Sequence, residues 1–145
     1  MAYVERSVVI QGPIQQVYEL AKDMESYPQF MRDVESVRVI ERQGNRTVTE
    51  WETSVDGTPI LWTEEDIFND DSFTIQYRLI EGDLEKFEGS WTFRETSEGT
   101  EVRLTVDYDF GIPELTQLIG PTLQEKVGEN SEMMLLGMKH KVEGS

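Results

Sequence analysis

Two carboxylates separated by one residue, Glu64 and Asp66, are the side chains of this chain best placed for acid–base chemistry. Alternate residues of a strand point to the same face, so both carboxyls lie on the side that carries Trp62. Two buried acids on one face can titrate apart and divide the roles of proton donor and acceptor. Since the chain has 29 acidic residues among 145, such pairs arise by chance, and the pattern favours a solvated strand end.

The other side chains with chemical potential are few. Asp107 and Asp109 form a second pair, on the face opposite Tyr108, where we expect them to face solvent and to bind no metal. His140 is the single histidine, so neither a Ser-His-acid triad nor a histidine-ligated metal is expected. Cysteine is absent, which excludes disulfides, thiol nucleophiles and Cys-ligated zinc. The sequence therefore assigns no catalytic residue, no metal site and no cofactor.

The net charge of the chain limits the kinds of partner that it can bind. The net charge of −16 repels phosphate backbones and anionic headgroups, so we expect no nucleic-acid partner. The sequence shows neither a signal peptide at MAYVERSVVI nor an apolar run of 18 residues, and this predicts a cytoplasmic protein without stable membrane insertion. We further expect a monomer or a weak homodimer. The length predicts one domain over 1–145.

The first elements follow from hydrophobic periodicity. Alternation of apolar and polar residues predicts a strand over 3–11. Pro13 suits the first position of a helix with one apolar stripe, and this helix should end before Pro28. We expect a second short helix that carries Phe30 and Met31.

Turn signals divide the middle of the chain into strands. We predict strands around Val37 and Val39, then over 47–55, 60–68, 73–80, 84–95 and 101–110. The turns between them are Gly44-Asn45, Asp56-Gly57, Asn69-Asp70-Asp71, Gly82-Asp83 and Ser97-Glu98-Gly99. One strand, two helices, six strands in an antiparallel meander and a last helix form an α+β pattern, with the helices on one face of the sheet.

The C-terminal region predicts a long amphipathic helix. Gly120-Pro121 should separate a helical turn at 114–119 from a kink or fresh start at Pro121. The run 121–142 then spans about 33 Å. Gly128 and Gly137 lie in its interior, and we expect each to admit a close neighbour, either a strand or a ligand.

Bulky side chains gather on the strand faces that we expect to face this helix. A packed core is one interpretation, and an apolar cavity with a few polar groups is the other. Methionines suit the adaptable wall of such a cavity, and the segment Gly111–Pro121 would form its lip. We expect the ligand-binding residues to be Phe30, Trp51, Trp62, Glu64, Tyr77, Phe87, Trp91, Tyr108, Ile119, Leu123, Val127, Met134 and Met138.

Several motifs resemble a known family. They are Gly12-Pro13, Val17-Tyr18, Asp23, Ser26-Tyr27-Pro28-Gln29-Phe30, Gly89-x-Trp91-x-Phe93 and Val106-Asp107-Tyr108-Asp109-Phe110. Over about residues 3–142 the chain resembles START-like (SRPBCC, helix-grip) proteins, in their polyketide cyclase/dehydrase and coenzyme-Q-binding branch. The resemblance implies a seven-stranded curved antiparallel sheet wrapped around a long C-terminal helix, with two short helices between the first two strands. It also implies a cavity for lipids, quinones, sterols or polyketides, without an invariant catalytic set.

We therefore predict binding or transport of a small hydrophobic ligand in an internal cavity. One alternative is a cyclase/aromatase-type enzyme, in which polar groups assist proton transfer; the candidates are Glu64, Asp66, Tyr77 and Tyr108. A second alternative is a ribosome- or protein-interacting module of the toxin-like members of the family.

Overall fold

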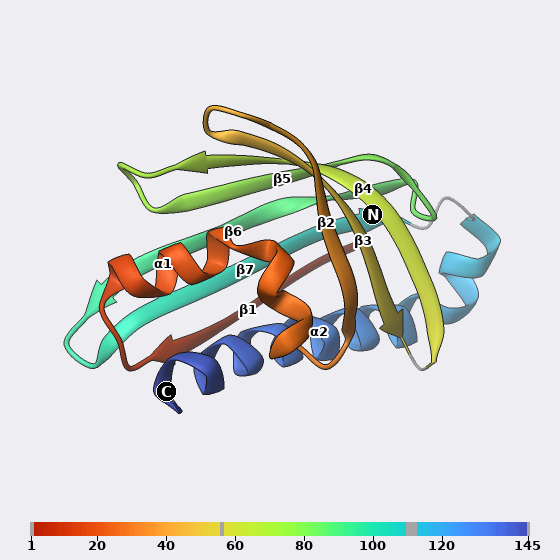
Figure 1. Ribbon diagram of the computed structural model, residues 1–145. Coiled ribbons are helices and arrows are strands. Elements are labelled where there is room, and N and C mark those ends of the chain that lie inside the picture. Colours follow the sequence, from red (N-terminus) through yellow and green to blue (C-terminus); the bar gives the residue numbers. More distant parts are fainter. Residues whose placement is uncertain (1, 56, 110–112, 145) are drawn as a thin grey trace.

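A curved antiparallel sheet and a long C-terminal helix dominate the computed structural model (Figure 1). It describes residues 2–55, 57–109 and 113–144, without the side chains of 55, 58, 113–121 and 123. The elements in chain order are β1 (Ala2–Ile10), α1 (Ile14–Lys22), the 3₁₀ helix η1 (Met24–Gln29), β2 (Val34–Gln43), β3 (Arg46–Val55), β4 (Thr58–Asn69), β5 (Thr74–Gly82), β6 (Lys86–Thr96), β7 (Gly99–Asp109) and α2 (Pro113–Glu143).

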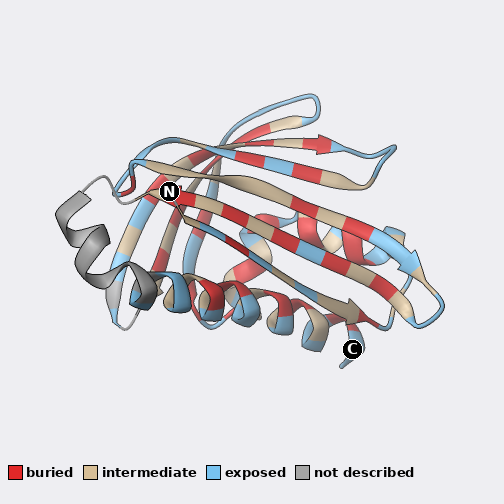
Figure 2. Cartoon of the chain, turned by 180° about the vertical axis from the view of Figure 1, so that it is seen from behind, coloured by how far each residue is buried: buried red, intermediate tan, exposed pale blue. Residues whose placement is uncertain are grey.

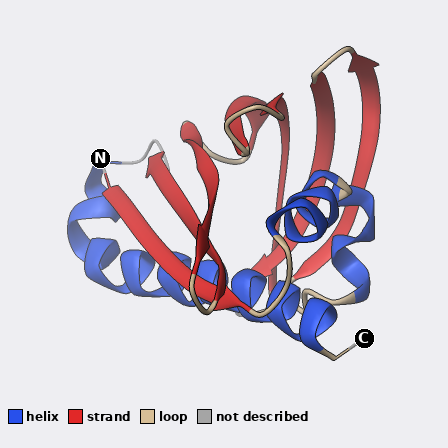
Figure 3. Ribbon diagram, turned by 90° about the vertical axis from the view of Figure 1, so that its left-hand side faces the viewer, coloured by secondary structure: helices blue, strands red, loops and turns tan. Residues whose placement is uncertain are grey.

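Strands β2 to β7 form a meander, and β1 pairs with β7 at one edge of the sheet. Its seven strands have the order β1-β7-β6-β5-β4-β3-β2, and every neighbouring pair is antiparallel. The sheet curves over α2, which lies across the open side of the curve, while α1 packs on β6 and β7 and η1 lies beside β2 (Figure 3). The predicted α+β helix-grip architecture, with two short helices between the first two strands, is confirmed.

Alternation along the strands builds the core. Buried and more exposed residues follow one another as bands in Figure 2. On β7 the inward residues Val102, Leu104, Val106 and Tyr108 are all buried, whereas their neighbours in sequence are more exposed. The inner face of the sheet and the helices across from it thus enclose one apolar core. None of the helices in the described ranges is long and apolar enough to span a membrane.

The second helix differs from the prediction. η1 includes Pro28 and ends at Gln29, so the expectation that Phe30 and Met31 belong to this helix is wrong. The backbone N–H groups of both residues donate to the Tyr27 carbonyl, at 3.1 and 2.8 Å, and this closes the turn. The fixed φ of proline suits a 3₁₀ turn, and the steric restriction on the residue before it is only a bias.

The terminal helix is also longer than predicted. α2 is a single helix of 31 residues, so the separate helical turn at 114–119 and the fresh start at Pro121 are wrong. A proline inside a helix removes one backbone hydrogen bond, and the helix continues on both sides of it. The predicted lip, Gly111–Pro121, lies outside the described residues at 111–112 and outside the described side chains at 113–121.

Two glycines let α2 approach its neighbours. A Cβ atom on Gly137 would clash with the backbone carbonyl of Phe30, and one on Gly128 would clash with the guanidinium of Arg6. The predicted strand or ligand is thus wrong for Gly137, whose neighbour is the loop after η1, while Gly128 lies against a side chain of the strand β1. The first of them is fixed backbone and the second is the end of a flexible side chain.

The contrast between a backbone neighbour and a side-chain neighbour can be tested with a matched pair of variants. Gly137→Ala should lower the free energy of unfolding by about 1–3 kcal/mol, because backbone must shift to accept the methyl group. Gly128→Ala should leave it unchanged or raise it by up to about 1 kcal/mol, because Arg6 can move and alanine favours the helix. Urea denaturation of both variants measures the contrast, and equal losses of stability would contradict the packing described above.

Candidate functional site

A stack of two indoles forms the inner wall of the sheet. Trp51 on β3 and Trp62 on β4 are directly opposite in the strand register, and their rings lie 5.5 Å apart at an interplanar angle of 6°. The ring of Phe87 packs 4.9 Å from Trp62, and the ring of Tyr27 packs 5.6 Å from Trp51. Trp51, Trp62 and Phe87 thus form an aromatic wall opposite residues of α2, and Tyr27 of η1 extends the cluster.

A small cavity separates this wall from α2. Its volume is about 40 Å³, room for a few water molecules at most, whereas pockets for drug-sized ligands measure roughly 300–1,000 Å³. The sheet and helix were expected to leave a ligand-sized space, and in this conformation the stacked rings and Met134 fill most of it. The cavity is lined by Trp51, Thr53, Trp62, Glu64, Tyr77, Phe87, Trp91, Leu104, Val106, Val127, Asn130, Ser131 and Met134.

The predicted ligand-binding residues divide into three groups. Those that line the cavity are Trp51, Trp62, Glu64, Tyr77, Phe87, Trp91, Val127 and Met134. Phe30, Tyr108 and Met138 are not among the lining residues; Tyr108 and Met138 are buried in the core, and Phe30 packs against it. Ile119 lies outside the described side chains, and so does Leu123.

Sequence reasoning missed five lining residues: Thr53, Leu104, Val106, Asn130 and Ser131. The three on strands have the parity of Trp51 and of the inner face of β7, so alternation places them on the right side. Asn130 and Ser131 follow Val127 by three and four residues, which puts them on the same helix face. Their polar type is the reason that the apolar pattern passed over them.

The acidic pair is buried, which corrects the expected solvated strand end. Glu64 is 3% exposed and Asp66 is 0% exposed. The Oδ2 atom of Asp66 accepts hydrogen bonds from the hydroxyls of Thr47, at 3.1 Å, and Thr49, at 2.7 Å. These threonines lie opposite the acids in the β3–β4 register, which pairs Thr47 with Asp66 and Thr49 with Glu64.

Both indoles of the wall are bound into the same polar network. Trp62 Nε1 donates to Glu64 Oε1 at 2.7 Å, and Trp51 Nε1 donates to Thr49 Oγ1 at 2.8 Å. Buried N–H groups need such partners because an unpaired donor costs about 1–3 kcal/mol. The network therefore fixes the orientation of the two rings relative to the acids.

Burial makes the acidic pair hold a proton more strongly than exposed carboxyls do. Among the described N–H and hydroxyl groups, none donates to Asp66 Oδ1, which is buried, but the carboxyl of Glu64 lies within hydrogen-bond reach of Asp66. Burial first, and then the nearby Asp66 charge, raises the pKa of Glu64 well above its usual range. Burial also raises the pKa of Asp66, against the hydrogen bonds it accepts. A protonated Glu64 that donates to Asp66 satisfies both groups.

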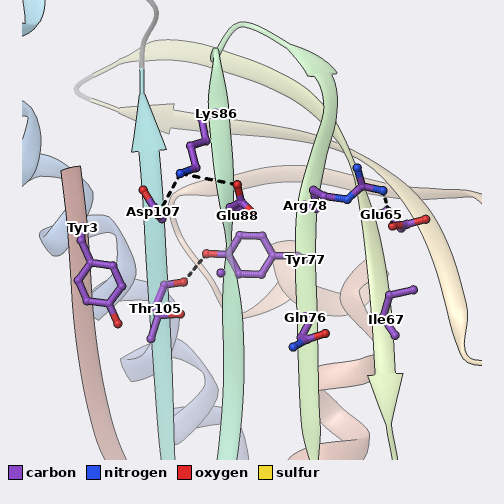
Figure 4. Close-up of a pocket in the computed structure, with 11 residues that line it drawn as sticks. Tyr3, Glu65, Ile67, Gln76, Tyr77, Arg78, Lys86, Glu88, Thr105 and Asp107 are labelled. Atoms are coloured by element: carbon purple, nitrogen blue, oxygen red, sulfur yellow. Dashed lines mark hydrogen bonds and ion pairs between the residues drawn. The ribbon is translucent and has the colours of Figure 1, made fainter. Parts of the chain in front are cut away.

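Tyr77 lies between the cavity and the outer face of the sheet. Its hydroxyl crosses β6 at Gly89 and donates to the Thr105 carbonyl on β7 at 2.5 Å (Figure 4). A Cβ atom on Gly89 would clash with that carbonyl, so only glycine fits there. Burial raises the pKa of Tyr77 well above its usual range. Its proton is therefore committed to a structural hydrogen bond.

The outer face carries a larger and more polar groove. It measures about 530 Å³ and includes Tyr3 and Tyr77 in its lining. Its charged side chains are paired with one another: Lys86 lies 3.1 Å from Asp107, and Arg78 lies 2.8 Å from Glu65. Asp107, expected to face solvent, is thus half-buried and bound to a lysine. The small inner cavity is the more apolar of the two spaces.

Comparison with known proteins agrees with this architecture. Residues 10–135 match the family described as polyketide cyclase / dehydrase and lipid transport. The chain belongs to this family. The match confirms the polyketide cyclase/dehydrase resemblance that the motifs suggested, and a START superfamily protein from Mycobacterium smegmatis shares the fold, at 17% identity and a TM-score of 0.84.

Individual relatives extend the match. The chain is 32% identical over 124 residues to the actinorhodin polyketide synthase bifunctional cyclase/dehydratase of Streptomyces coelicolor, a match that covers 83% of this chain and 38% of that protein. The crystal structure of TTHA0849 from Thermus thermophilus is 34% identical, with a TM-score of 0.94 over 99% of this chain and 98% of that one. The ZhuI aromatase/cyclase from Streptomyces sp. R1128 shares the fold, at 21% identity and a TM-score of 0.89 over 98% and 93% of the two chains.

The raised pKa of Glu64 predicts how stability depends on pH. Because its folded pKa lies above its unfolded value near 4.5, the folded chain binds the extra proton, and the free energy of unfolding falls as the pH rises through this interval. Glu64→Gln should make this decline shallower between pH 5 and pH 8, because glutamine has no proton to lose. Urea denaturation at several pH values measures it.

Glu65→Gln is the matched control. Glu65 is adjacent in sequence but lies on the outer face, where Arg46 and then Arg78 lower its pKa. Its folded pKa lies below the unfolded value, so its contribution is present above that value and is lost only toward acid pH. This variant should therefore not flatten the decline above pH 5. Parallel curves for the wild type and Glu64→Gln would show that Glu64 ionises normally in the folded protein.

Proposed function

We propose that this protein binds a small hydrophobic ligand between the sheet and α2, with the ligand against the Trp51–Trp62 wall and its polar end at Glu64. Membership of a family with a ligand-binding fold supports this role. The observation that carries it is the composition of the cavity, whose lining is mostly aromatic and aliphatic, with one carboxyl group and the polar side chains of Thr53, Asn130 and Ser131. A few polar groups in an apolar lining are typical of sites that orient a ligand.

Because the cavity is small, a ligand must displace side chains to enter it. Met134 and Val127 are only partly buried on the α2 side, and a methionine side chain can take other rotamers at low cost. A ligand that buries roughly 250 Å² of apolar surface gains about 6 kcal/mol before the costs of association. This gain must exceed the loss of the contacts between α2 and the wall that the ligand replaces.

A second candidate is acid–base catalysis on the bound ligand. Burial raises the pKa of both carboxyls of the Glu64–Asp66 pair beside the cavity, and a pair that shares one proton offers the two states that a proton-transfer reaction needs. The name of the Streptomyces coelicolor relative, a cyclase/dehydratase, agrees with such a reaction class. Tyr77 is not a proton donor in this proposal, because its hydroxyl is bound to Thr105. The ribosome- or protein-interacting alternative stays a prediction.

The neutral probe 2-(1-naphthyl)ethanol tests the site. Met134→Ala should bind it about three- to tenfold more tightly than the wild type, because part of the space is already open. The same change should lower the free energy of unfolding by about 2 kcal/mol, at the low end for a buried methionine. Titration followed by tryptophan fluorescence measures the affinity.

Two further variants localise the effect. Met133→Ala is the control, because Met133 is 38% exposed on another face of α2, and its affinity should equal that of the wild type. Ser131→Met places a longer side chain in the cavity and should weaken binding. One dissociation constant shared by the wild type, Met134→Ala and Ser131→Met would place the probe elsewhere, and a failure of wild type and Met134→Ala to bind it would contradict the proposed function.

A further inference from the structure

The charges that face the inner cavity have one sign. Glu64 lines the cavity and Asp66 adjoins it from the same strand face. No lysine, arginine or histidine is among the described residues of the lining. The segment 110–123, where side chains are not described, has none in its sequence either. A ligand in this cavity therefore meets carboxyl groups and no basic side chain from these residues.

Basic residues on the neighbouring elements are bound to other acids. Arg46 on β3 and Arg78 on β5 both bind Glu65, at 2.5 and 2.8 Å, on the outer face of the sheet. Lys22 on α1 binds Asp70, at 3.1 Å, next to the exposed end of β4. The buried pair is stabilised by hydroxyl and indole donors in place of a cation. A buried negative charge without an ionic partner favours any cation that can reach it.

The aromatic wall favours the same kind of ligand. Indole and phenyl rings present negative faces, and a cation within about 6 Å of a ring centroid gains about 0.5–2 kcal/mol. The rings of Trp51, Trp62 and Phe87 surround the cavity beside Glu64. A carboxylate in the same place would lose its hydration and would meet the electron-rich rings and the acidic pair.

We infer that the cavity selects hydrophobic ligands whose polar end is a protonated amine, and that it discriminates against hydrophobic carboxylates. This inference rests on the proposed function, because it assigns the chemistry of the polar end of a ligand bound in that cavity. The ammonium group lies at Glu64 and donates to the carboxyl pair, while the apolar part lies between the tryptophan wall and Met134.

Three probes with one ring system test the charge preference. They are 2-(1-naphthyl)ethylamine, the neutral 2-(1-naphthyl)ethanol and 1-naphthylacetate, titrated at pH 7 and 150 mM salt to screen the net charge of the protein. The amine should bind at least about tenfold more tightly than the carboxylate, with the alcohol between them.

The double variant Glu64→Gln/Asp66→Asn removes both ionisable groups, and with them any negative charge of the pair, and keeps the shapes of the side chains. It should lose the preference for the amine and keep the affinity for the alcohol within about threefold. Glu65→Gln, which removes the charge next in sequence but on the outer face, should keep the full preference. If the double variant does not fold, Asp66→Asn alone makes the same comparison, because Glu64 can then remain protonated.

The outcomes separate the two proposals. Equal affinities for amine and carboxylate in the wild type would overturn the amine inference, and so would a preference that survives in the double variant. If the alcohol still binds in those cases and responds to Met134→Ala, the proposed function stands without the inference. If none of the three probes binds to the wild type or to Met134→Ala, both proposals fail.

Discussion

The pairing of Trp51 with Trp62 across β3 and β4 is the contact on which the site depends. Two stacked indoles on the inner face form part of the cavity wall, and each brings an N–H group into the interior that needs an acceptor. Thr49 and Glu64 supply these acceptors, and both connect to Asp66. The burial of two acids is therefore tied to the burial of two large aromatic rings.

Much of the fold was predictable because strand alternation and turn residues are local properties of the sequence. The same signals placed Glu64 and Asp66 on the side of Trp62, but their residue type argued for solvent. The two-residue hairpin signal Asp56-Gly57 could have shown which residues of the preceding strand lie opposite the acids. A turn of that length sets Thr47 and Thr49 opposite the acids, and this register shows how the acids are satisfied inside the protein.

Other features depend on contacts that no local pattern reports. The 3₁₀ helix retains Pro28 because backbone groups beyond it close the turn on Tyr27. The size of the cavity depends on how the rings stack and how closely α2 approaches, and the aromatic content that predicted an open space also fills it. Composition can therefore predict which side chains line a cavity, whereas only packing decides its volume.

The two sides of the cavity have different physical roles. The polar end is built on β3 and β4, where hydrogen bonds between strands and between side chains fix Glu64, Asp66 and the indoles. The opposite wall is one helix face with a flexible methionine at its centre. Buried acids without a cation reduce stability, so a chain selected for folding alone gains nothing from them. Because such departures from local rules gather at functional sites, we assign ligand chemistry to the sheet and ligand size to α2.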